Sequence, residues 1–165
     1  MRGKAIPKRK IKPDPKFNRL DIAKLINYVM QRGKKTTAQK IVYGAFDIIE
    51  KATKRDPFQT YDKALKNIGP SLEIRGRRIG GANYQIPFPV GEDRRQTLTF
   101  RWIIIAAKAR KGKPMANALA SELMDAAKGE GAAFKKKEDT LRMAEANKAF
   151  AHFARFHKKK KKISN

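Results

Sequence analysis

The sequence predicts a mainly α-helical protein: a six-helix bundle with a protruding two-stranded β-ribbon between helices three and four, plus extended basic termini. Three observations lead to this prediction. Apolar residues recur at three- and four-residue spacing in six separate stretches, which is typical of amphipathic helices. Residues 72–90 instead alternate with a period of two around a glycine pair. Both ends of the chain are rich in Lys and Arg and lack apolar periodicity.

The length of 165 residues and the 41% hydrophobic content favour one folded domain with tails. We expect an extended basic arm over residues 1–16, because prolines among its cations disfavour a helix. A single helical domain is expected over 17–156, with the ribbon at about 72–90. A basic tail is expected over 157–165.

Local signals define the three helices before the ribbon. In the first, Leu20, Ala23 and Met30 recur at helical spacing, and Gly33 is placed to end the helix. In the second, Thr36 is the expected N-cap of a capping box with Gln39. The expected buried stripe of this helix is Ile41, Ala45, Ile48, Ile49 and Ala52.

The third helix begins with an expected N-cap at Asp56 and a proline at its first position, and Gly69-Pro70 ends it. In the ribbon, the glycines at 80 and 81 predict a hairpin turn. Prolines in the second strand predict that no third strand pairs with it. An isolated ribbon is marginally stable, so we expect another element to support it.

Three helices follow the ribbon. The fourth is expected to bury Leu98, Trp102, Ile105 and Ala109. The fifth runs from Met115 to Lys128 and is closed by Gly129. The last runs from about Phe134 into the tail, with an apolar face that includes Leu141, Met143, Phe150 and Phe153.

Charge is the most informative property of the composition. Forty Lys and Arg against fifteen Asp and Glu give a net charge of +25. Residues 1–16 and 152–165 each carry +6, so about half of the excess lies on the folded body. A surplus of this size repels itself unless a polyanion neutralises it. The sequence therefore predicts a structured binder of a polyanion.

Little in the sequence supports an enzyme, a cofactor or a metal site. The chain has no cysteine, no phosphate-binding loop motif and only two histidines, His152 and His157, which point apart on a helix. The longest apolar run, 102–107, is too short to span a membrane. We expect no catalysis, no cofactor, no metal and no membrane partner.

Two groups of cations are candidate RNA-binding residues. Arg75, Arg77 and Arg78 lie on one strand and repel each other without a counter-anion, and Tyr84 follows the turn. The fourth helix carries a second group, although a helix C-terminus accommodates cations for structural reasons as well. The members of this group are Arg94, Arg95, Arg101, Lys108, Arg110, Lys111 and Lys113. RNA is favoured over DNA because no dimeric recognition helix, finger or basic zipper is present.

The sequence resembles the family of bacterial-type small-subunit ribosomal protein seven over roughly residues 8–153. The matching blocks are PDPKF at 13–17, GGANYQIPFPV at 80–90, RWIIIAAKAR at 101–110, MANALASELMDAAKGEGAAFKKKED at 115–139 and RMAEANKAFAH at 142–152. The resemblance implies a non-enzymatic primary binder of the 3′ major domain of small-subunit ribosomal RNA. Such a protein nucleates assembly of the head and lies near the exit tRNA site.

The resemblance also implies partners and site residues. The partners are the ribosomal RNA, exit-site tRNA and mRNA, and the neighbouring ribosomal proteins nine and eleven, on a cytoplasmic ribosome or, alternatively, an organellar one. The ribosomal RNA contacts would be Lys8, Arg9, Lys10, Lys34, Lys35 and the two cation groups above. The residues near tRNA and mRNA would be Gly81, Ala82, Asn83, Tyr84, Arg142 and Asn147.

Two departures limit the resemblance. The extreme N-terminus lacks the family's arginine cluster, and the tail contains five lysines at 158–162. Two other classes stay open: a general nucleic-acid-binding polycation or RNA chaperone without ribosomal specificity, and a helical protein–protein scaffold.

Overall fold

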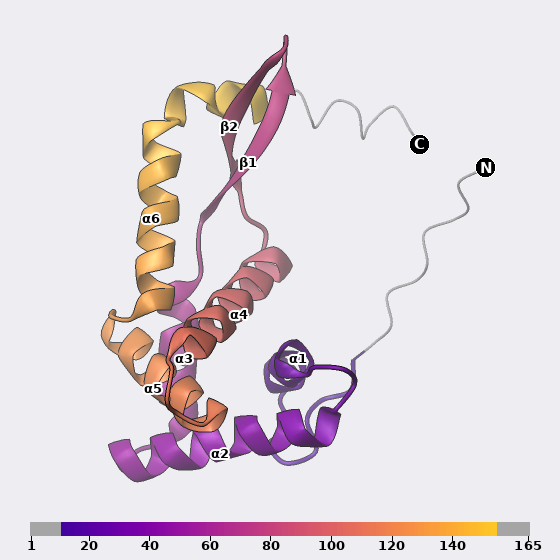
Figure 1. Cartoon of the computed structure of the whole chain (residues 1–165), viewed down its shortest axis with the longest axis vertical. Helices are drawn as coiled ribbons and strands as arrows, with labels where there is room; N and C mark the ends of the chain where they lie inside the picture. Colours follow the sequence, from indigo (N-terminus) through magenta and orange to yellow (C-terminus); the bar gives the residue numbers. More distant parts are fainter. Residues whose placement is uncertain (1–10, 155–165) are drawn as a thin grey trace, which may run out of the picture.

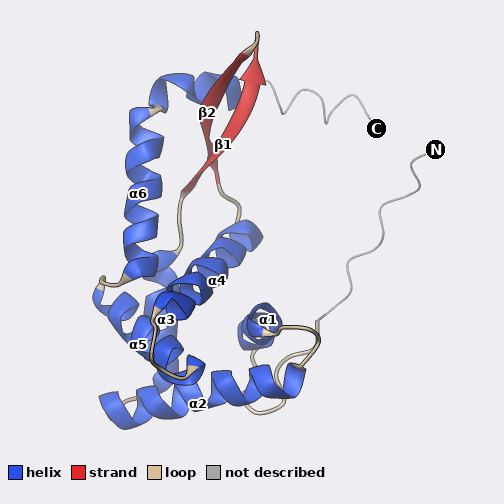
Figure 2. Ribbon diagram, in the orientation of Figure 1, coloured by secondary structure: helices blue, strands red, loops and turns tan. Residues whose placement is uncertain are grey.

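The computed structural model describes residues 11–154 of the chain. Within this range the elements are α1 (Leu20–Val29), α2 (Lys35–Thr53), α3 (Pro57–Ile68), β1 (Leu72–Ile79), β2 (Ala82–Pro89), α4 (Glu92–Ala109), α5 (Met115–Lys128), α6 (Ala132–Ala146) and the 3-10 helix η1 (Lys148–Ala154). The two strands form an antiparallel ribbon between α3 and α4 that extends away from the helices (Figures 1 and 2). The predicted fold class is confirmed.

The hydrophobic core lies among helices α1 to α5. Helix α5 contacts α2, α3 and α4, while α1 packs against α2 and α4. The largest fully buried side chains include Phe46, Tyr61, Phe100, Leu119 and Leu123, which come from four different helices. The core therefore forms without the ribbon tip, which is held at the far end of the molecule from α2 (Figure 1).

Two of the predicted helix ends are confirmed. The Asp56 carboxylate accepts a hydrogen bond from the Phe58 backbone N–H at 2.9 Å, and Pro57 occupies the first position of α3. Gly129 follows α5 in the left-handed conformation, with φ of 87°. Both ends depend on interactions between close neighbours in the sequence, which a local pattern can identify.

Two other predicted ends are wrong. Helix α2 begins at Lys35, so Thr36 lies inside its first turn, and the true N-cap, Lys34, makes no side-chain cap bond. Helix α1 ends at Val29, and Gly33 lies in the following loop, where it and Arg32 both have positive φ. The loop satisfies its backbone through bonds such as Lys35 N–H to the Gly33 carbonyl at 2.8 Å.

The predicted buried faces of two helices differ from the observed ones. In α4, Ile105 is 65% exposed and Ala109 is also exposed, while Ile103 and Ile104 are buried. In α2 the residue at the end of the expected stripe, Ala52, is exposed. The difference arises because α4 contacts α1, α5 and α6. The positions of these neighbouring helices, and not the helical period alone, determine which residues of α4 are buried.

The last helix is divided in two. Helix α6 ends at Ala146, and Asn147 donates from its side chain to the Met143 carbonyl at 2.8 Å. The Met143 side chain, expected on an apolar face, is exposed. The chain then turns into η1, which lies against the ribbon (Figure 1). The predicted single helix is therefore a helix followed by a bent 3-10 segment.

The ribbon is supported along its length by these C-terminal elements. Strand β1 contacts α6, and β2 contacts η1. Ile86 and Phe88 of β2 are buried, and Pro87 and Pro89 face no further strand among residues 11–154. These contacts supply the expected support for the isolated ribbon.

The end of the predicted arm is anchored to the helices. Asp14 is 3% exposed, and its carboxylate accepts hydrogen bonds from the backbone N–H groups of Lys16 and Phe17 and from the Tyr43 hydroxyl at 2.7 Å. The Phe17 ring packs edge-on against Tyr43 and Phe46 of α2. Residues 14–17 are therefore a closed turn rather than extended chain.

Candidate nucleic-acid interface

The ribbon places its arginines on two faces. The strand register pairs Arg75 with Ile86, Arg77 with Tyr84 and Arg78 with Asn83. Because successive strand residues point to opposite faces, Arg75 and Arg77 share one face and Arg78 lies on the other. Only two of the three predicted ribbon arginines can therefore act together on one ligand group.

Glu73 connects the base of the ribbon to α4. Its carboxylate accepts from Arg94 Nε at 3.1 Å and from Arg75 Nη2 at 3.0 Å. The hydrogen bond from Arg94 and the weaker one from Arg75 lower the pKa of Glu73, although partial burial opposes the shift. The glutamate therefore stays ionised at neutral pH and holds two of the predicted RNA-binding arginines.

Phe88 holds arginines on the same face of the ribbon. The guanidinium carbons of Arg75 and Arg77 each lie 5.5 Å from the centre of the Phe88 ring. This distance is within the range of a cation–π interaction. The arginines at the ribbon base are thus gathered around an acid and an aromatic ring.

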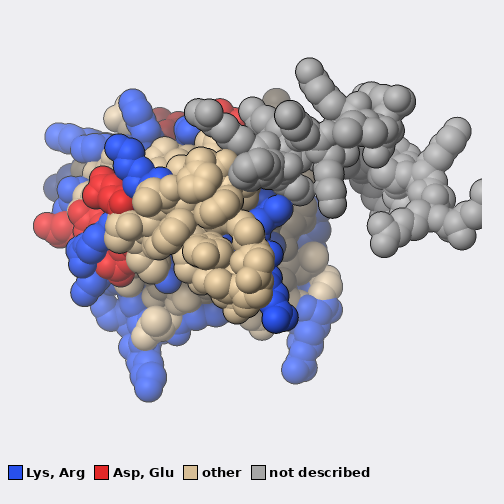
Figure 3. Space-filling view, turned by 90° about the horizontal axis from the view of Figure 1, so that it is seen from above, with Lys and Arg blue, Asp and Glu red and all other residues tan. Residues whose placement is uncertain are grey.

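The ribbon tip is exposed, but Tyr84 is packed. Gly80 and Gly81 form the turn with φ of 56° and 92°, a conformation that favours glycine, and residues 81–83 are exposed. The Tyr84 ring lies 5.1 Å from the Phe150 ring and 5.5 Å from the Phe153 ring of η1. Figure 3, viewed from above, shows an uncharged area bordered by Lys and Arg, with Asp and Glu gathered at one side.

The predicted cations of α4 divide into exposed and internally bonded groups. Arg101 and Lys108 are exposed and form no ion pair with any residue in 11–154, and Arg95, Lys111 and Lys113 are exposed as well. Arg110 is different because its guanidinium contacts two acids of α5.

Arg110 belongs to a network that joins three helices. Its Nε and Nη2 donate to Glu122 at 2.9 and 2.6 Å, and Nη2 also donates to Asp125 at 2.6 Å. Glu122 has no exposed surface, and its other oxygen accepts from the Ala133 N–H at 2.9 Å. The Nε and Nη2 donors of Arg110 are therefore used for contacts between helices.

The structure brings two further predicted cations together. Lys34, before α2, and Lys108, near the end of α4, line one hollow whose other walls include Val29, Ile41 and Met115. Lys35 is exposed and lines a different hollow, together with Asp14 and Gln39. The predicted arm cations Lys8, Arg9 and Lys10, like His157 and the tail lysines, lie outside the described residues.

The C-terminal candidates differ from each other. Arg142 is exposed on α6, whereas the Asn147 side chain is bonded to the end of its own helix. The Asn147 side chain therefore already makes one hydrogen bond within the fold. Arg142 forms no ion pair with any residue in 11–154.

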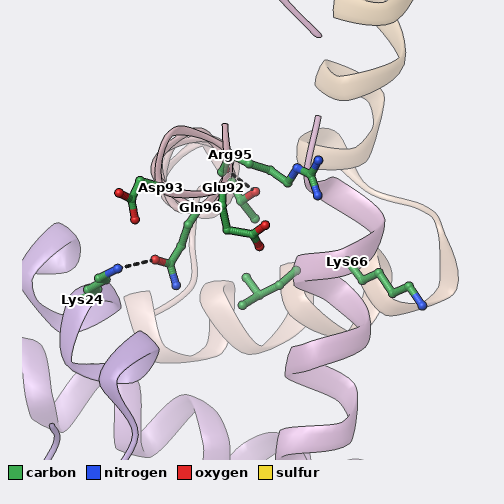
Figure 4. A pocket seen from close by; sticks show the side chains of 8 residues that line it. Lys24, Lys66, Glu92, Asp93, Arg95 and Gln96 are labelled. Atoms are coloured by element: carbon green, nitrogen blue, oxygen red, sulfur yellow. Dashed lines mark hydrogen bonds between the residues drawn. The ribbon is translucent and has the colours of Figure 1, made fainter. Parts of the chain in front are cut away.

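A second hollow lies between α1, α3 and α4 (Figure 4). Lys24 donates to Gln96 across it at 2.8 Å. Lys66 and Arg95 also line it, together with the acids Glu92 and Asp93. The hollow has three cations and two acids, a smaller excess of positive charge than the three arginines and one glutamate at the ribbon base, so it suits a phosphate less well.

Sequence reasoning missed Glu73 and Phe88, the two residues that hold the ribbon arginines. The period-two pattern contains a signal for Glu73, since it places residues 73, 75 and 77 on one face of a strand. The contact with Arg94 depends on how the ribbon meets α4 and has no signal in the sequence.

Other kinds of site find no support in the described part of the chain. Among residues 11–154, no three His, Cys, Asp or Glu side chains are grouped so that they could hold a metal ion. No helix within that range is both long enough and apolar enough to cross a membrane.

Comparison with known proteins identifies the family. The family model described as "Ribosomal protein S7p/S5e" matches residues 1–148. "Small ribosomal subunit protein uS7" of Thermotoga maritima is 57% identical over 153 residues, covering 93% of this chain and 99% of the relative. The protein of the same name from Pelotomaculum thermopropionicum is 55% identical over 149 residues, covering 90% and 96%. The chain therefore belongs to the ribosomal protein S7p/S5e family.

Proposed function

We propose that this chain is a structural protein of the small ribosomal subunit that binds the 3′ major domain of the ribosomal RNA directly and nucleates assembly of the head. Its membership of the family makes it a structural ribosomal protein and not an enzyme. The observation that carries RNA binding is the placement of exposed cations on the ribbon, on α4 and before α2. Such a distribution suits a protein that contacts folded RNA from several sides.

The finer parts of the proposal rest on the resemblance and on exposure. The ribbon tip at residues 81–83 is exposed, and so is Arg142 near the end of α6, the helix that contacts the ribbon (Figure 1). This exposure supports a position near exit-site tRNA and mRNA. Ribosomal proteins nine and eleven are the proposed protein neighbours, and a cytoplasmic ribosome is the proposed location. The proposed organisation is an arm over 1–16, a body over 17–156 and a tail over 157–165.

Nuclease footprinting on naked small-subunit ribosomal RNA tests the proposal. The full chain should protect nucleotides only in the 3′ major domain, because a structured interface recognises one folded region. A general polycation or RNA chaperone, the alternative function, would protect scattered regions and would bind an unrelated RNA equally well. Protection outside the 3′ major domain would contradict the proposal.

A further inference from the structure

The base of the ribbon gathers three arginines around one glutamate and one phenylalanine. Glu73 accepts hydrogen bonds from Arg75 of β1 and from Arg94 of α4. Phe88 carries the guanidinium groups of Arg75 and Arg77 over its ring. Three cations and one anion leave this ribbon-base cluster (Glu73, Arg75, Arg77, Phe88 and Arg94) with a net positive charge.

We infer that the ribbon-base cluster is a preorganised binding site for RNA phosphates, in which Glu73 and Phe88 act as positioning residues for the arginines. The inference rests on the proposed function, because it takes the ribosomal RNA as the ligand. An arginine that moves freely loses rotamer freedom when it binds a phosphate, whereas an arginine that is already held loses less. An acid inside the site can therefore strengthen the binding of an anion.

The cluster keeps donors available for such a ligand. A guanidinium has five N–H donors. Glu73 accepts hydrogen bonds from two nitrogens of Arg94 and one of Arg75, and the Arg77 side chain donates to no other residue within 11–154. The side chains of Arg75 and Arg94 are 48% and 40% exposed, so their remaining donors reach solvent.

Glu73 is poorly placed to repel a phosphate. Its side chain is only 15% exposed, whereas both arginines bonded to it are far more exposed. Its charge is paired with two guanidinium groups, which reduces the field that an approaching phosphate meets. Planar guanidinium groups bind phosphate through two parallel hydrogen bonds, so their orientation affects affinity as well as their charge.

The two possible roles of Glu73 predict opposite results. If Glu73 were only a negative charge on a basic surface, its removal would strengthen RNA binding by reducing repulsion. If it positions Arg75 and Arg94, its removal weakens binding to the RNA that fits the site. The sign of the change therefore distinguishes the two roles.

The first experiment compares Glu73→Gln with Glu138→Gln in the full chain. Each substitution removes one acid, and Glu138 is exposed on α6 with no ion pair to another residue in 11–154. We expect Glu73→Gln to weaken binding to naked small-subunit ribosomal RNA about three- to tenfold, and Glu138→Gln to leave it unchanged or slightly tighter. On an unrelated RNA of equal length the two variants should behave alike, because charge alone determines that binding.

An increase in ribosomal RNA affinity for Glu73→Gln that equals the increase for Glu138→Gln would overturn the role of Glu73. The melting temperature of each variant shows whether the fold is intact. If Glu73→Gln disturbs the ribbon, a second experiment on Phe88 and Arg77 still tests the cluster.

The second experiment is a double-mutant cycle with Arg77→Lys and Phe88→Leu. Lysine keeps the charge but cannot lay a planar group over the ring, so the losses from the two substitutions should overlap and the double variant should be little worse than either. Arg78→Lys is the matched control, because Arg78 lies on the opposite face and its effect should add to that of Phe88→Leu. Additive losses for Arg77→Lys and Phe88→Leu would contradict positioning by Phe88.

These outcomes are separate from the fate of the proposed function. If the unaltered chain binds an unrelated RNA as tightly as the ribosomal RNA, the proposed function fails. The cycle between Arg77 and Phe88 is measured on the ribosomal RNA whether or not an unrelated RNA binds as tightly, and its additivity decides the inference.

Discussion

Arg110 in the helical body and Arg94 at the ribbon base both bind a glutamate through two guanidinium nitrogens, but their surroundings differ. Glu122, the partner of Arg110, has no exposed surface. Glu73, the partner of Arg94, is partly exposed, and Arg94 itself is 40% exposed. The Arg110 side chain is itself 29% exposed, so the two pairs differ mainly in their glutamate, which is fully buried in one region and partly exposed in the other.

The two pairs therefore differ in the hydrogen-bond donors and acceptors that remain available to a ligand. Around Glu122, both carboxylate oxygens are used, by Arg110 and by the Ala133 N–H at the start of α6. Around Glu73, the acceptor is shared between two arginines whose other donors reach solvent. Burial therefore distinguishes an arginine that holds helices together from one that can bind a ligand, and the comparison can be tested by removing each partner.

The largest effect is expected from Glu122→Ala. Its removal leaves the Ala133 N–H without an acceptor and leaves Arg110 with Asp125 as its remaining acid partner within residues 11–154, which should cost about 2–3 kcal/mol of unfolding free energy. Glu73→Ala, the matched change in the open pair, should cost at most about 1 kcal/mol. Urea unfolding followed by circular dichroism measures both. Equal losses would show that burial does not separate the two pairs.

The second effect concerns binding rather than stability. Replacing Arg75, Arg77 and Arg78 together with alanine should leave the melting temperature nearly unchanged, because the helical core lies elsewhere. Affinity for small-subunit ribosomal RNA should fall by about tenfold or more. The slope of log affinity against log salt should become shallower by about 2 to 3. Filter binding over a salt series measures both quantities, and an unchanged slope would mean that these arginines do not contact phosphates.

A smaller effect is expected where the ribbon rests on η1. Tyr84→Ala removes the ring that packs against Phe150 and Phe153, a contact worth about 1 kcal/mol. The backbone amides of β1 and β2 should then exchange with solvent faster, while those of α5 should not change. Tyr84→Phe is the control, because it keeps the ring and should preserve slow exchange. Unchanged exchange in Tyr84→Ala would show that η1 does not stabilise the ribbon.

The sequence predicts those features that depend on near neighbours. The N-cap at Asp56, the glycine that closes α5 and the hairpin turn at residues 80 and 81 each involve residues within a few positions. The alternating pattern also predicts the ribbon, since strand periodicity belongs to the backbone itself. Local sequence patterns are therefore sufficient to predict these elements.

Local patterns do not predict the features that depend on packing. Ile105 fits an apolar helical face by spacing, yet the arrangement of neighbouring helices leaves it 65% exposed. Arg110 fits a group of cations at a helix end, yet a glutamate on the next helix binds it. A one-dimensional pattern contains charge and spacing but not the contacts between elements, and these contacts decide which cations are free.

The carboxylate of Asp14 is also buried, but unlike those of Glu122 and Glu73 it accepts its hydrogen bonds from neutral groups. Its partners are two backbone N–H groups and the Tyr43 hydroxyl. Burial and the hydrogen bond to Asp14 raise the pKa of Tyr43 to about 12, whereas an unfolded chain has a tyrosine pKa of about 10. The folded state therefore favours the protonated hydroxyl.

The smallest predicted effect follows from this shift. The stabilisation that the Tyr43 hydroxyl provides should be complete below about pH 10, where the unfolded tyrosine is still protonated, and should be lost as pH rises through about 12. Tyr43→Phe removes the hydroxyl, so the unaltered chain should exceed this variant in unfolding free energy by about 0.5–1 kcal/mol at pH 8. That difference should shrink as pH rises from about 10 to about 12, as measured by urea unfolding at each pH. The two proteins differ only in the Tyr43 hydroxyl, so the difference between them isolates this group. A difference that stays constant with pH would mean that Asp14 is held by its backbone donors alone, and that a buried carboxylate in this fold needs neither a cation nor a hydroxyl partner.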